Sequence, residues 1–406
     1  MKTFLTQFVW FLTMYCNPTH SLNLQQITSA SFNQGTVHTL KWVTVGNRSY
    51  LAVAGAEDTQ GQEIRLYKFD IRTGHLILID TISFCNGSVQ SLDWIKASGK
   101  YYLALGGNEV NSIVQNIRIY KFDHTGSENL ELAASASFNP LSSVNTVKWL
   151  PAHTPGTSNH LLYLSVTGDD PVSGQEVRVY SFNTLNNQLE VTLATASFYN
   201  GSVQSSDWLT IKNDSYLAVG GFEHNSIVQN IRIYKFNPQN SSDLEFVASA
   251  PFNNSSVVNA VSWLSYKNKT YLAVAGEDPV ANKEIRIYQF NPTNFSLRAT
   301  DATASFAQGT VLALEWVKVK GNFYLTAGGL SVHPQQPQIE MFLFNSTTEQ
   351  LTSQVKTLQA PNPVNAIDWN TIRAKKYLAV GGQDDNGSEI RIYQLTQDLP
   401  PGCILP

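Results

Sequence analysis

Charged residues and cysteines are scarce in this 406-residue chain: 14% of the residues are Asp, Glu, Lys or Arg, and three are Cys. Since three cysteines cannot form a disulfide framework, a hydrophobic core has to provide the stability. The formal net charge is −4 and no run of basic residues occurs, which argues against nucleic-acid binding. After the N-terminus no apolar run reaches the roughly 18 residues of a membrane helix, so we expect no membrane span.

Signals for helices and for catalysis are also lacking. No stretch of about 12 residues keeps helical periodicity. The histidines are scattered without metal-ligand spacing, and neither a Gly-x-Ser-x-Gly motif nor a phosphate-binding loop is present. We therefore predict a protein that is not an enzyme and that uses no metal and no cofactor. The alternative is an active site assembled across several repeats.

One sequence motif does occur seven times. In each copy a Val is followed five residues later by a Trp, then by a Tyr, and five residues after the Tyr by a Gly. A strand with the pattern Ile-Arg-Ile-Tyr follows in the most regular copies. The tryptophans, which we expect to pack between repeats rather than to form a ligand cage, are 52 to 59 residues apart: Trp42, Trp94, Trp149, Trp208, Trp263, Trp316 and Trp369. A repeat of this length indicates a solenoid, a propeller or an array.

Each copy contains four short runs of β-branched and aromatic residues, separated by Gly, Asn, Asp and Ser. In the first copy these runs are 37–43, 50–54, 63–69 and 76–84. Four strands in each of seven units predict an all-β fold, a seven-bladed β-propeller of four-stranded blades.

The phase of the repeats predicts how the ring closes. Residues 22–32 match the fourth strand of other copies, and the last copy stops after its third strand, 389–395. The N-terminal strand should therefore complete the last blade and remove an exposed edge.

The first 21 residues have the pattern of an export signal. Lys2 precedes an apolar run from Phe4 to Tyr15 that is too short to span a bilayer, and small residues stand at the cleavage-site positions near Ser21. A buried first strand is the alternative, but the run lacks the alternation that such a strand needs. We expect an exported protein (periplasmic, cell-surface or extracellular) in which Cys85 and Cys403 stay unpaired.

The expected domain organisation follows from these boundaries. A signal peptide covers 1–21, the propeller covers 22–396, and a C-terminal tail covers 397–406. Within the propeller the closing strand is expected over 22–35, and the blades at about 36–87, 88–142, 143–201, 202–255, 256–309, 310–362 and 363–396.

The repeats resemble those of WD40-repeat proteins. Residues 376–382, an acid, and then 389–393 are similar to the second and third strands of that family, and 70–74 are similar to the turn that follows. The resemblance covers nearly all of the chain after the signal peptide and implies a β-propeller. The Trp-Asp dipeptide of the family is replaced by pairs such as Tyr67-Lys68, and the Gly-His dipeptide by pairs such as Ser31-Phe32, so the hydrogen-bonded tetrad of the family is missing.

Six repeats carry an acid seven residues after the tyrosine and an arginine on the third strand. The repeat that lacks the acid, at Ser331, also lacks the arginine, at Glu340. Such paired loss predicts structural carboxylate–guanidinium contacts, and the WD40 resemblance likewise implies a structural turn residue. A ring of carboxylates that binds a ligand is the alternative. The expected pairs are Glu57/Arg65, Glu109/Arg118, Asp170/Arg178, Glu223/Arg232, Asp278/Arg286 and Asp384/Arg391.

The loops between the second and third strands supply the candidate binding residues. Repeats two and four share an amide-rich loop that is longer than a turn needs, while odd repeats carry paired acids. This pattern indicates either recognition loops or a recent duplication of two-repeat units. The candidates are Asp58, Asn111, Ser112, Gln115, Asp169, His224, Asn225, Ser226, Gln229 and Asp385.

These observations favour a non-catalytic scaffold that binds a protein partner, as yet unidentified, through its loop faces, which is an analogy at the level of the fold. The alternative is a lectin-like adhesin that binds glycans through its Asn/Gln-rich loops and aromatic residues such as Tyr199 and Phe222. We expect a monomer that binds no nucleic acid.

Overall fold

The computed structural model describes residues 21–57, 61–84, 87–109, 115–139, 142–151, 160–199, 201–223, 229–239, 243–253, 256–278, 280–306, 308–332, 336–357 and 360–398. The signal-peptide prediction for residues 1–20, the three cysteines and most of the predicted C-terminal tail lie outside these residues. In the part of the chain that the structure describes, no helix is long and apolar enough to cross a membrane.

The described chain forms 28 antiparallel strands, which confirms the all-β propeller class. Blade one contains β2 (Thr36–Val45), β3 (Arg48–Ala56), β4 (Ile64–Asp70) and β5 (His75–Ile82). Blade two contains β6 (Ser88–Ala97), β7 (Lys100–Asn108), β8 (Ile117–Asp123) and β9 (Asn129–Ala136). Blade three contains β10 (Val144–Trp149), β11 (Leu161–Gly168), β12 (Val177–Asn183) and β13 (Gln188–Ala196). Blade four contains β14 (Ser202–Ile211), β15 (Asp214–Phe222), β16 (Ile231–Phe236) and β17 (Leu244–Ala250).

The remaining blades follow the same order. Blade five contains β18 (Val258–Tyr266), β19 (Lys269–Gly276), β20 (Ile285–Asn291) and β21 (Ser296–Ala304). Blade six contains β22 (Thr310–Val319), β23 (Asn322–Leu330), β24 (Ile339–Asn345) and β25 (Gln350–Thr357). Blade seven contains β26 (Val364–Ile372), β27 (Lys375–Gly382), β28 (Ile390–Asp398) and β1 (Ser21–Ala30). Blades one and two share one bridge, between Ala56 and Ser88, which joins them into an eight-stranded sheet.

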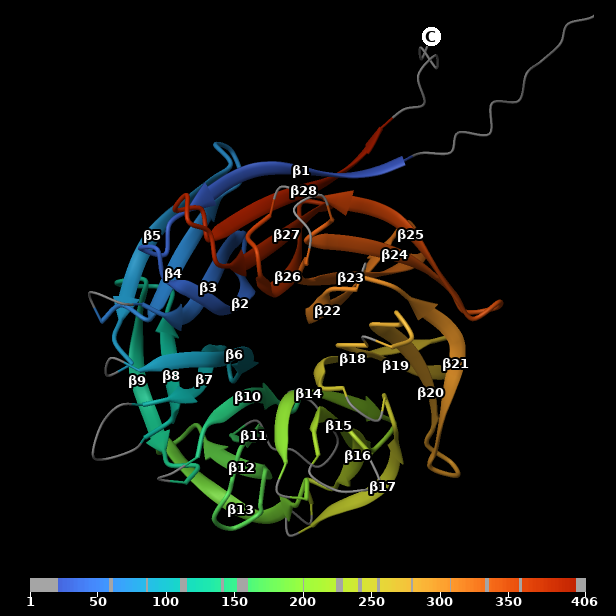
Figure 1. Ribbon diagram of the computed structural model, residues 1–406. Coiled ribbons are helices and arrows are strands. Elements are labelled where there is room, and N and C mark those ends of the chain that lie inside the picture. Colours follow the sequence, from blue (N-terminus) through green and yellow to red (C-terminus); the bar gives the residue numbers. More distant parts are fainter. Residues whose placement is uncertain are drawn as a thin grey trace, which may run out of the picture.

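The two ends of the described chain meet in one sheet. Strand β1 runs antiparallel to β28, from Leu22 opposite Gln397 to Ala30 opposite Ile390. Figure 1 shows the blades as a ring, with the first strand of each blade nearest the centre and β1 on the outer side of β28. The N-terminal strand therefore closes the last blade, as the repeat phase predicts.

Burial decreases from the inner strands of a blade to the outer strand. The second strand of blade one, β3, has buried residues over seven consecutive positions because both faces of the sheet pack on neighbouring blades. The outermost strand β5 has no buried residue. This gradient explains why second strands are continuously apolar, as in Tyr50-Leu51-Ala52-Val53, whereas outer strands mix polar and apolar residues.

The repeated glycine is required by a close approach inside each blade. In blade four the register shifts between Val203 and Ser205 of β14, opposite Gly220 and Gly221 of β15. A Cβ on Gly221 would lie 2.0 Å from the carbonyl oxygen of Ser202, which no side chain could tolerate. The glycine is thus the partner of a β-bulge in the first strand.

Aromatic side chains connect each blade to the one before it. In six blades a phenylalanine on the third strand packs edge-on or tilted against the tryptophan of its own blade and the tyrosine of the preceding blade, with ring centroids 4.9–6.1 Å apart. The six phenylalanines are Phe69, Phe122, Phe182, Phe236, Phe290 and Phe344. The tryptophans therefore belong to inter-blade packing, as the sequence indicates.

Deleting residues 22–32 should open the ring. The edge of β28 would lose all of its pairing with β1, and the apolar side chains of Leu22 and Leu24 would no longer cover blade seven. We expect a lower melting temperature and soluble aggregates, measured by scanning fluorimetry and size-exclusion chromatography.

A matched control replaces Asn23 and Gln25 by Ala, because both side chains are exposed on the same strand. The control should remain monodisperse with an unchanged melting temperature. A folded, soluble deletion variant with wild-type melting would show that β1 closes nothing.

Candidate functional site: the loop face

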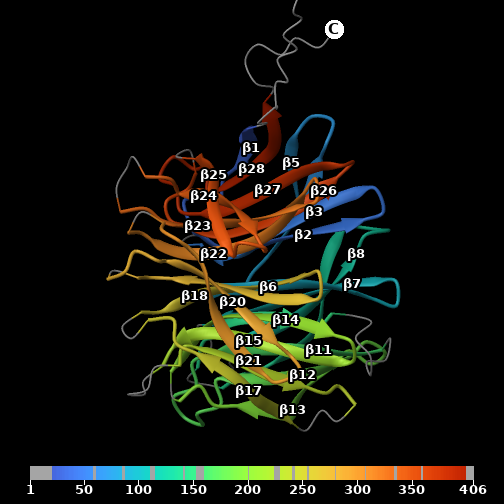
Figure 2. The same ribbon diagram turned by 90° about the vertical axis from the view of Figure 1, so that its right-hand side faces the viewer.

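The up-and-down order of the strands gives the ring two different faces. Loops from the second to the third strand, and from the fourth strand to the next blade, emerge on one side, which we name the loop face. Connections between strands one and two, and between strands three and four, emerge on the other side, which we name the turn face; they are short turns except between β10 and β11 of blade three. Figure 2 shows loops and turns projecting from both sides of the ring.

Six ion pairs lie beneath the loop face, each within one blade. The guanidinium–carboxylate distances are 2.5–2.6 Å for Arg65–Glu57, Arg118–Glu109, Arg178–Asp170 and Arg286–Asp278, and Arg232–Glu223 and Arg391–Asp384 are also in contact. The carboxylates are at most 7% exposed. The six acids and arginines that the sequence pairs are therefore in contact in the structure.

Blade six shows what replaces the pair. Glu340 occupies the position of the arginine, and its buried carboxylate lies 3.1 Å from the Lys356 ammonium and accepts a hydrogen bond from Ser353. The partners come from the outer strand β25 of the same blade. In blade six the residue at the arginine position is thus itself an acid, and its partner comes from the neighbouring strand rather than from the loop.

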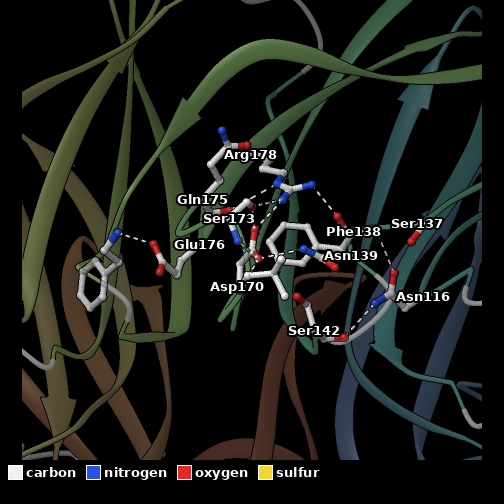
Figure 3. Close-up of polar contacts among 12 residues, drawn as sticks. Asn116, Ser137, Phe138, Asn139, Ser142, Asp170, Ser173, Gln175, Glu176 and Arg178 are labelled. Carbon is white, nitrogen blue, oxygen red and sulfur yellow. Dashed lines mark hydrogen bonds and ion pairs between the residues drawn. The ribbon is translucent and has the colours of Figure 1, made fainter.

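Five of the six arginines also contact the preceding blade. In blade three, Arg178 donates to the Phe138 carbonyl oxygen of blade two, and its guanidinium carbon lies 4.6 Å from the centre of the Phe138 ring (Figure 3). Arg65, Arg118 and Arg232 donate in the same way to the carbonyl oxygens of Ser31, Ser83 and Ser197. The buried cation therefore ties two blades through a hydrogen bond and a cation–π contact.

The carboxylates are saturated by protein donors. Burial alone would raise the pKa of Asp170, but hydrogen bonds from Ser173 and Arg178 outweigh burial and lower its pKa. The same balance lowers the pKa of Asp278 and of Asp384. No group of three or more His, Cys, Asp or Glu suited to a metal ion occurs among the described residues. Donors within the protein therefore already occupy these carboxylates.

The residue directly before the third strand makes a second recurring contact, which the sequence did not predict. In odd blades the carboxylate of Glu63, Glu176, Glu284 or Glu389 accepts the backbone N–H of the phenylalanine that ends the same blade. In blades two and four the amide oxygen of Asn116 or Asn230 does so. These contacts lie beside the Ser-Phe pairs that replace the Gly-His dipeptide of WD40 repeats. The alternation of Glu and Asn before the third strand was the available signal.

Four of the ten candidate binding residues lie in the part of the chain that the structure describes, and these four belong to four different blades. Asp58, Asn111, Ser112, His224, Asn225 and Ser226 lie outside the described residues. The backbone N–H groups of Gln115 and Gln229 donate to Glu109 and Glu223, and Asp169 accepts a hydrogen bond from Ser143. Asp385 lines a polar pocket of about 540 Å³ in blade seven.

Gln229 does line a cleft at the outer part of blade four, which we name the blade-four cleft. Its volume is about 490 Å³, and Tyr199, Arg232, Tyr234 and Phe246 also line it. The Arg232 guanidinium carbon lies 4.2 Å from the centre of the Tyr199 ring, while Tyr199 and Phe246 are each 53% exposed. The cleft therefore presents two exposed aromatic rings, one of them stacked on a buried cation.

Exposed apolar side chains are distributed unequally between the faces. Of thirteen large apolar residues that are exposed in the described chain, six lie on the loop face: Val172, Tyr199, Phe222, Val280, Leu330 and Val332. Six others lie on outermost strands, and Leu185 is the remaining one, on the turn face. The loop face is therefore the better candidate for apolar contact with a partner.

The central channel is lined by polar side chains that the sequence reading also missed. In five of the blades the residue before the tryptophan lines a cavity of about 400 Å³. These residues are Lys41, Lys148, Asp207, Ser262 and Glu315. Carboxylates at this position in blades two, four and seven accept the backbone N–H of the next blade's tryptophan: Asp93 from Trp149, Asp207 from Trp263, and Asp368 from Trp42. The channel residues thus act as inter-blade ties.

Arg118→Ala should destabilise the fold by about 1–3 kcal/mol, because the change leaves the buried Glu109 carboxylate without its cation. Chemical denaturation measures the effect. Arg298→Ala is the control, since that arginine is 57% exposed and pairs with Glu349 at the surface. The control should change stability by less than about 1 kcal/mol. Equal stability of the two variants would contradict the role of the buried pair.

Glu315 predicts a pH dependence of stability. Burial, the largest effect, raises the pKa of Glu315 to about 7, although Lys41 acts against it. The folded state therefore binds a proton that the unfolded chain releases above pH ~4.5, so the penalty from ionised Glu315 grows as the pH rises towards 7 and is complete above it.

Glu315→Gln removes this penalty and should raise stability more at pH 8 than at pH 5. Because the side chain is 30% exposed to channel solvent, the difference should be on the order of 1 kcal/mol. Melting temperatures at both pH values measure it. Glu131→Gln, at a half-exposed carboxylate, is the control and should show the same change at both pH values. A pH-independent effect of Glu315→Gln would contradict the raised pKa.

Comparisons with known proteins give a fold and no closer relationship. No protein-family model matches the chain, and no curated protein matches its sequence. Among solved structures, one chain of the crystal structure of the mitotic checkpoint complex is similar, with a TM-score of 0.57 and 15% identity, and the match covers 98% of both chains. At this level of identity the likeness extends to the fold, and the chain is similar to β-propellers over nearly its whole length.

Proposed function

We propose that the protein is a non-catalytic, exported scaffold that binds a protein partner through its loop face, as a monomer. The observation that carries the proposal is the gathering of exposed apolar side chains on the loop face. The blade-four cleft adds two exposed rings, Tyr199 of this face and Phe246 of an outermost strand. The similar solved chain belongs to the crystal structure of a protein complex, which supports a scaffold at the level of fold analogy.

The blade-four cleft has the composition of an interface hot spot. Tyr and Arg are enriched at such positions, and Tyr199 stacks on Arg232, whose guanidinium is held by Glu223. A ring that is already fixed loses little conformational freedom when a partner binds. An apolar side chain of the partner would occupy the space between Tyr199 and Phe246, beside the Gln229 amide.

The experiment compares partner capture by two double variants. Tyr199→Asn with Phe246→Ala removes both exposed rings; Asn tolerates the φ of 54° at residue 199, and blade five has Ala299 at the position of Phe246. The control, Leu132→Ala with Leu193→Ala, removes two exposed apolar side chains from other blades. Each variant serves as bait after crosslinking in its native compartment, and melting temperatures verify that it is folded.

We expect the cleft variant to lose the captured protein at least tenfold, since hot-spot residues each contribute more than about 1 kcal/mol, and the control to retain it. A glycan array run in parallel tests the lectin alternative. Glycan binding that depends on Tyr199 and Phe246, without protein capture, would replace the scaffold proposal. Equal capture by both variants would place the interface elsewhere.

A further inference from the structure

The turn face carries basic residues on the tips of its inner hairpins. In every blade except blade three, we define a tip as the eight residues that start at the tryptophan of the first strand. The six tips are 42–49, 94–101, 208–215, 263–270, 316–323 and 369–376. Together we name the six tips the basic collar. They contain Arg48, Lys96, Lys100, Lys212, Lys267, Lys269, Lys318, Lys320, Arg373, Lys375 and Lys376.

Charge is strongly concentrated in the collar. Its eleven cations and one acid, Asp214, give a net formal charge of +10, whereas the whole chain has −4, so all other residues together carry −14. Ten of the cations are exposed, and Lys376 is half-buried. Because the first strands surround the channel, the tips form a ring around the channel mouth (Figure 1). The sequence contains no basic run, but the closed ring brings cations from separate repeats together into a basic surface.

The turns hold cations where the backbone disfavours them. Each collar hairpin has a two-residue connection, which prefers Asn or Gly because its residues adopt positive φ. Lys212, Lys267, Lys320 and Arg373 occupy such positions with φ of 47–57°. A non-glycine side chain other than Asn or Asp is uncommon there. Four blades therefore place a cation at the most protruding point of a hairpin against the local backbone preference.

Apart from Asp214 in the collar, the acids of this face lie in the outer turns, where neighbouring cations or backbone N–H groups bind them. Glu128 pairs with Arg48 and Lys68, and Glu349 pairs with Arg298. Asp70 and Asp123 accept backbone N–H groups of their own turns. Asp214 pairs with Lys235. The turn face thus has a basic inner ring and an outer ring that contains acids.

We propose that the basic collar binds a linear anionic polysaccharide, in particular a sulfated one. Nine of the eleven cations are Lys, a point charge that suits diffuse recognition of a flexible polyanion, whereas bidentate recognition of carboxylates prefers Arg. One large exposed apolar residue, Leu185, lies on the described part of this face, so a folded protein would find little apolar contact. The outer turns contain both acids and the cations that pair with them, so the excess positive charge of this face lies in the collar, which a single flexible chain can follow from blade to blade.

This site is independent of the blade-four cleft, which lies towards the opposite face. Lys96, Lys267 and Lys318 lie 5.0–5.3 Å from the ring centres of Tyr101, Tyr266 and Phe323. The aromatic rings hold these ammonium groups near the hairpin tips. The polysaccharide would cross the channel mouth and contact cations from several blades at once.

The test measures binding to heparin as the probe, by calorimetry and by salt elution from a heparin column. The collar variant combines Lys267→Asn, Lys320→Asn and Arg373→Asn in three adjacent blades, at positions where Asn fits the positive φ and the fold is therefore retained. The control combines Lys121→Gln, Lys283→Gln and Arg298→Gln, which lie outside the collar and change the net charge equally. We expect the collar variant to bind roughly tenfold more weakly at physiological salt and to elute earlier, as the loss of three ionic contacts implies.

The control should bind heparin like the wild-type protein. Weak binding by the wild-type protein, or equal losses in both variants, would overturn the proposal. Duplex DNA, anionic phosphatidylserine vesicles and a poly-glutamate peptide are tested at matched charge. Tighter binding of any of these than of heparin would overturn the assignment to a polysaccharide.

Discussion

A buried arginine that reaches into the preceding blade is the interaction on which the ring depends. A four-stranded blade cannot bury both of its faces alone, so its stability depends on contacts with its neighbours. Arg178 combines an ion pair with Asp170, a hydrogen bond to Phe138 of blade two and a contact with the Phe138 ring. One desolvated cation thereby fixes a loop, a strand and the adjacent blade, which explains why acid and arginine are lost together in blade six.

Closure of the ring requires a seam between two odd blades, since seven blades alternate between two types. In blades three and five, Asn145 or Asn259 of the first strand donates a hydrogen bond to the next blade. In blades two and four, Asp93 or Asp207 of the first strand accepts a hydrogen bond from the next blade. Blade seven uses both devices towards blade one: Asn365 donates to Val37, and Asp368 accepts from Trp42 and Lys41. The seam between like neighbours therefore combines the ties that are separate elsewhere.

The repeats allowed the blade architecture, the closing strand and the acid–arginine contacts to be predicted, because the strand pattern recurs in every repeat and the acid and the arginine stand seven to nine residues apart in six of them. Arg118 and Glu109 are nine residues apart, so one blade is enough to reveal them. The channel residues and the basic collar could not be recognised in that way. Lys267, Lys320 and Arg373 are each 53 residues from the next, and they share a surface only after the ring has closed. The blade-four cleft was also missed, because Phe246 is unique among the residues at its position: the equivalents are Leu78, Leu132, Val191, Ala299, Ser353 and Gln26.

The two faces are free to differ because the interior is independent of them. Second strands and the buried ties determine the packing of the blades, while hairpin tips and loops contribute little to it. A cation at a positive-φ turn position costs some local stability, on the order of 1 kcal/mol, which a core built from seven mutually supporting blades tolerates. The loop face could thus accumulate apolar side chains and the turn face a net positive charge without conflict. Repetition supplies the stability, and departures from repetition, at Tyr199, Phe246 and the collar lysines, supply the surfaces on which recognition would depend.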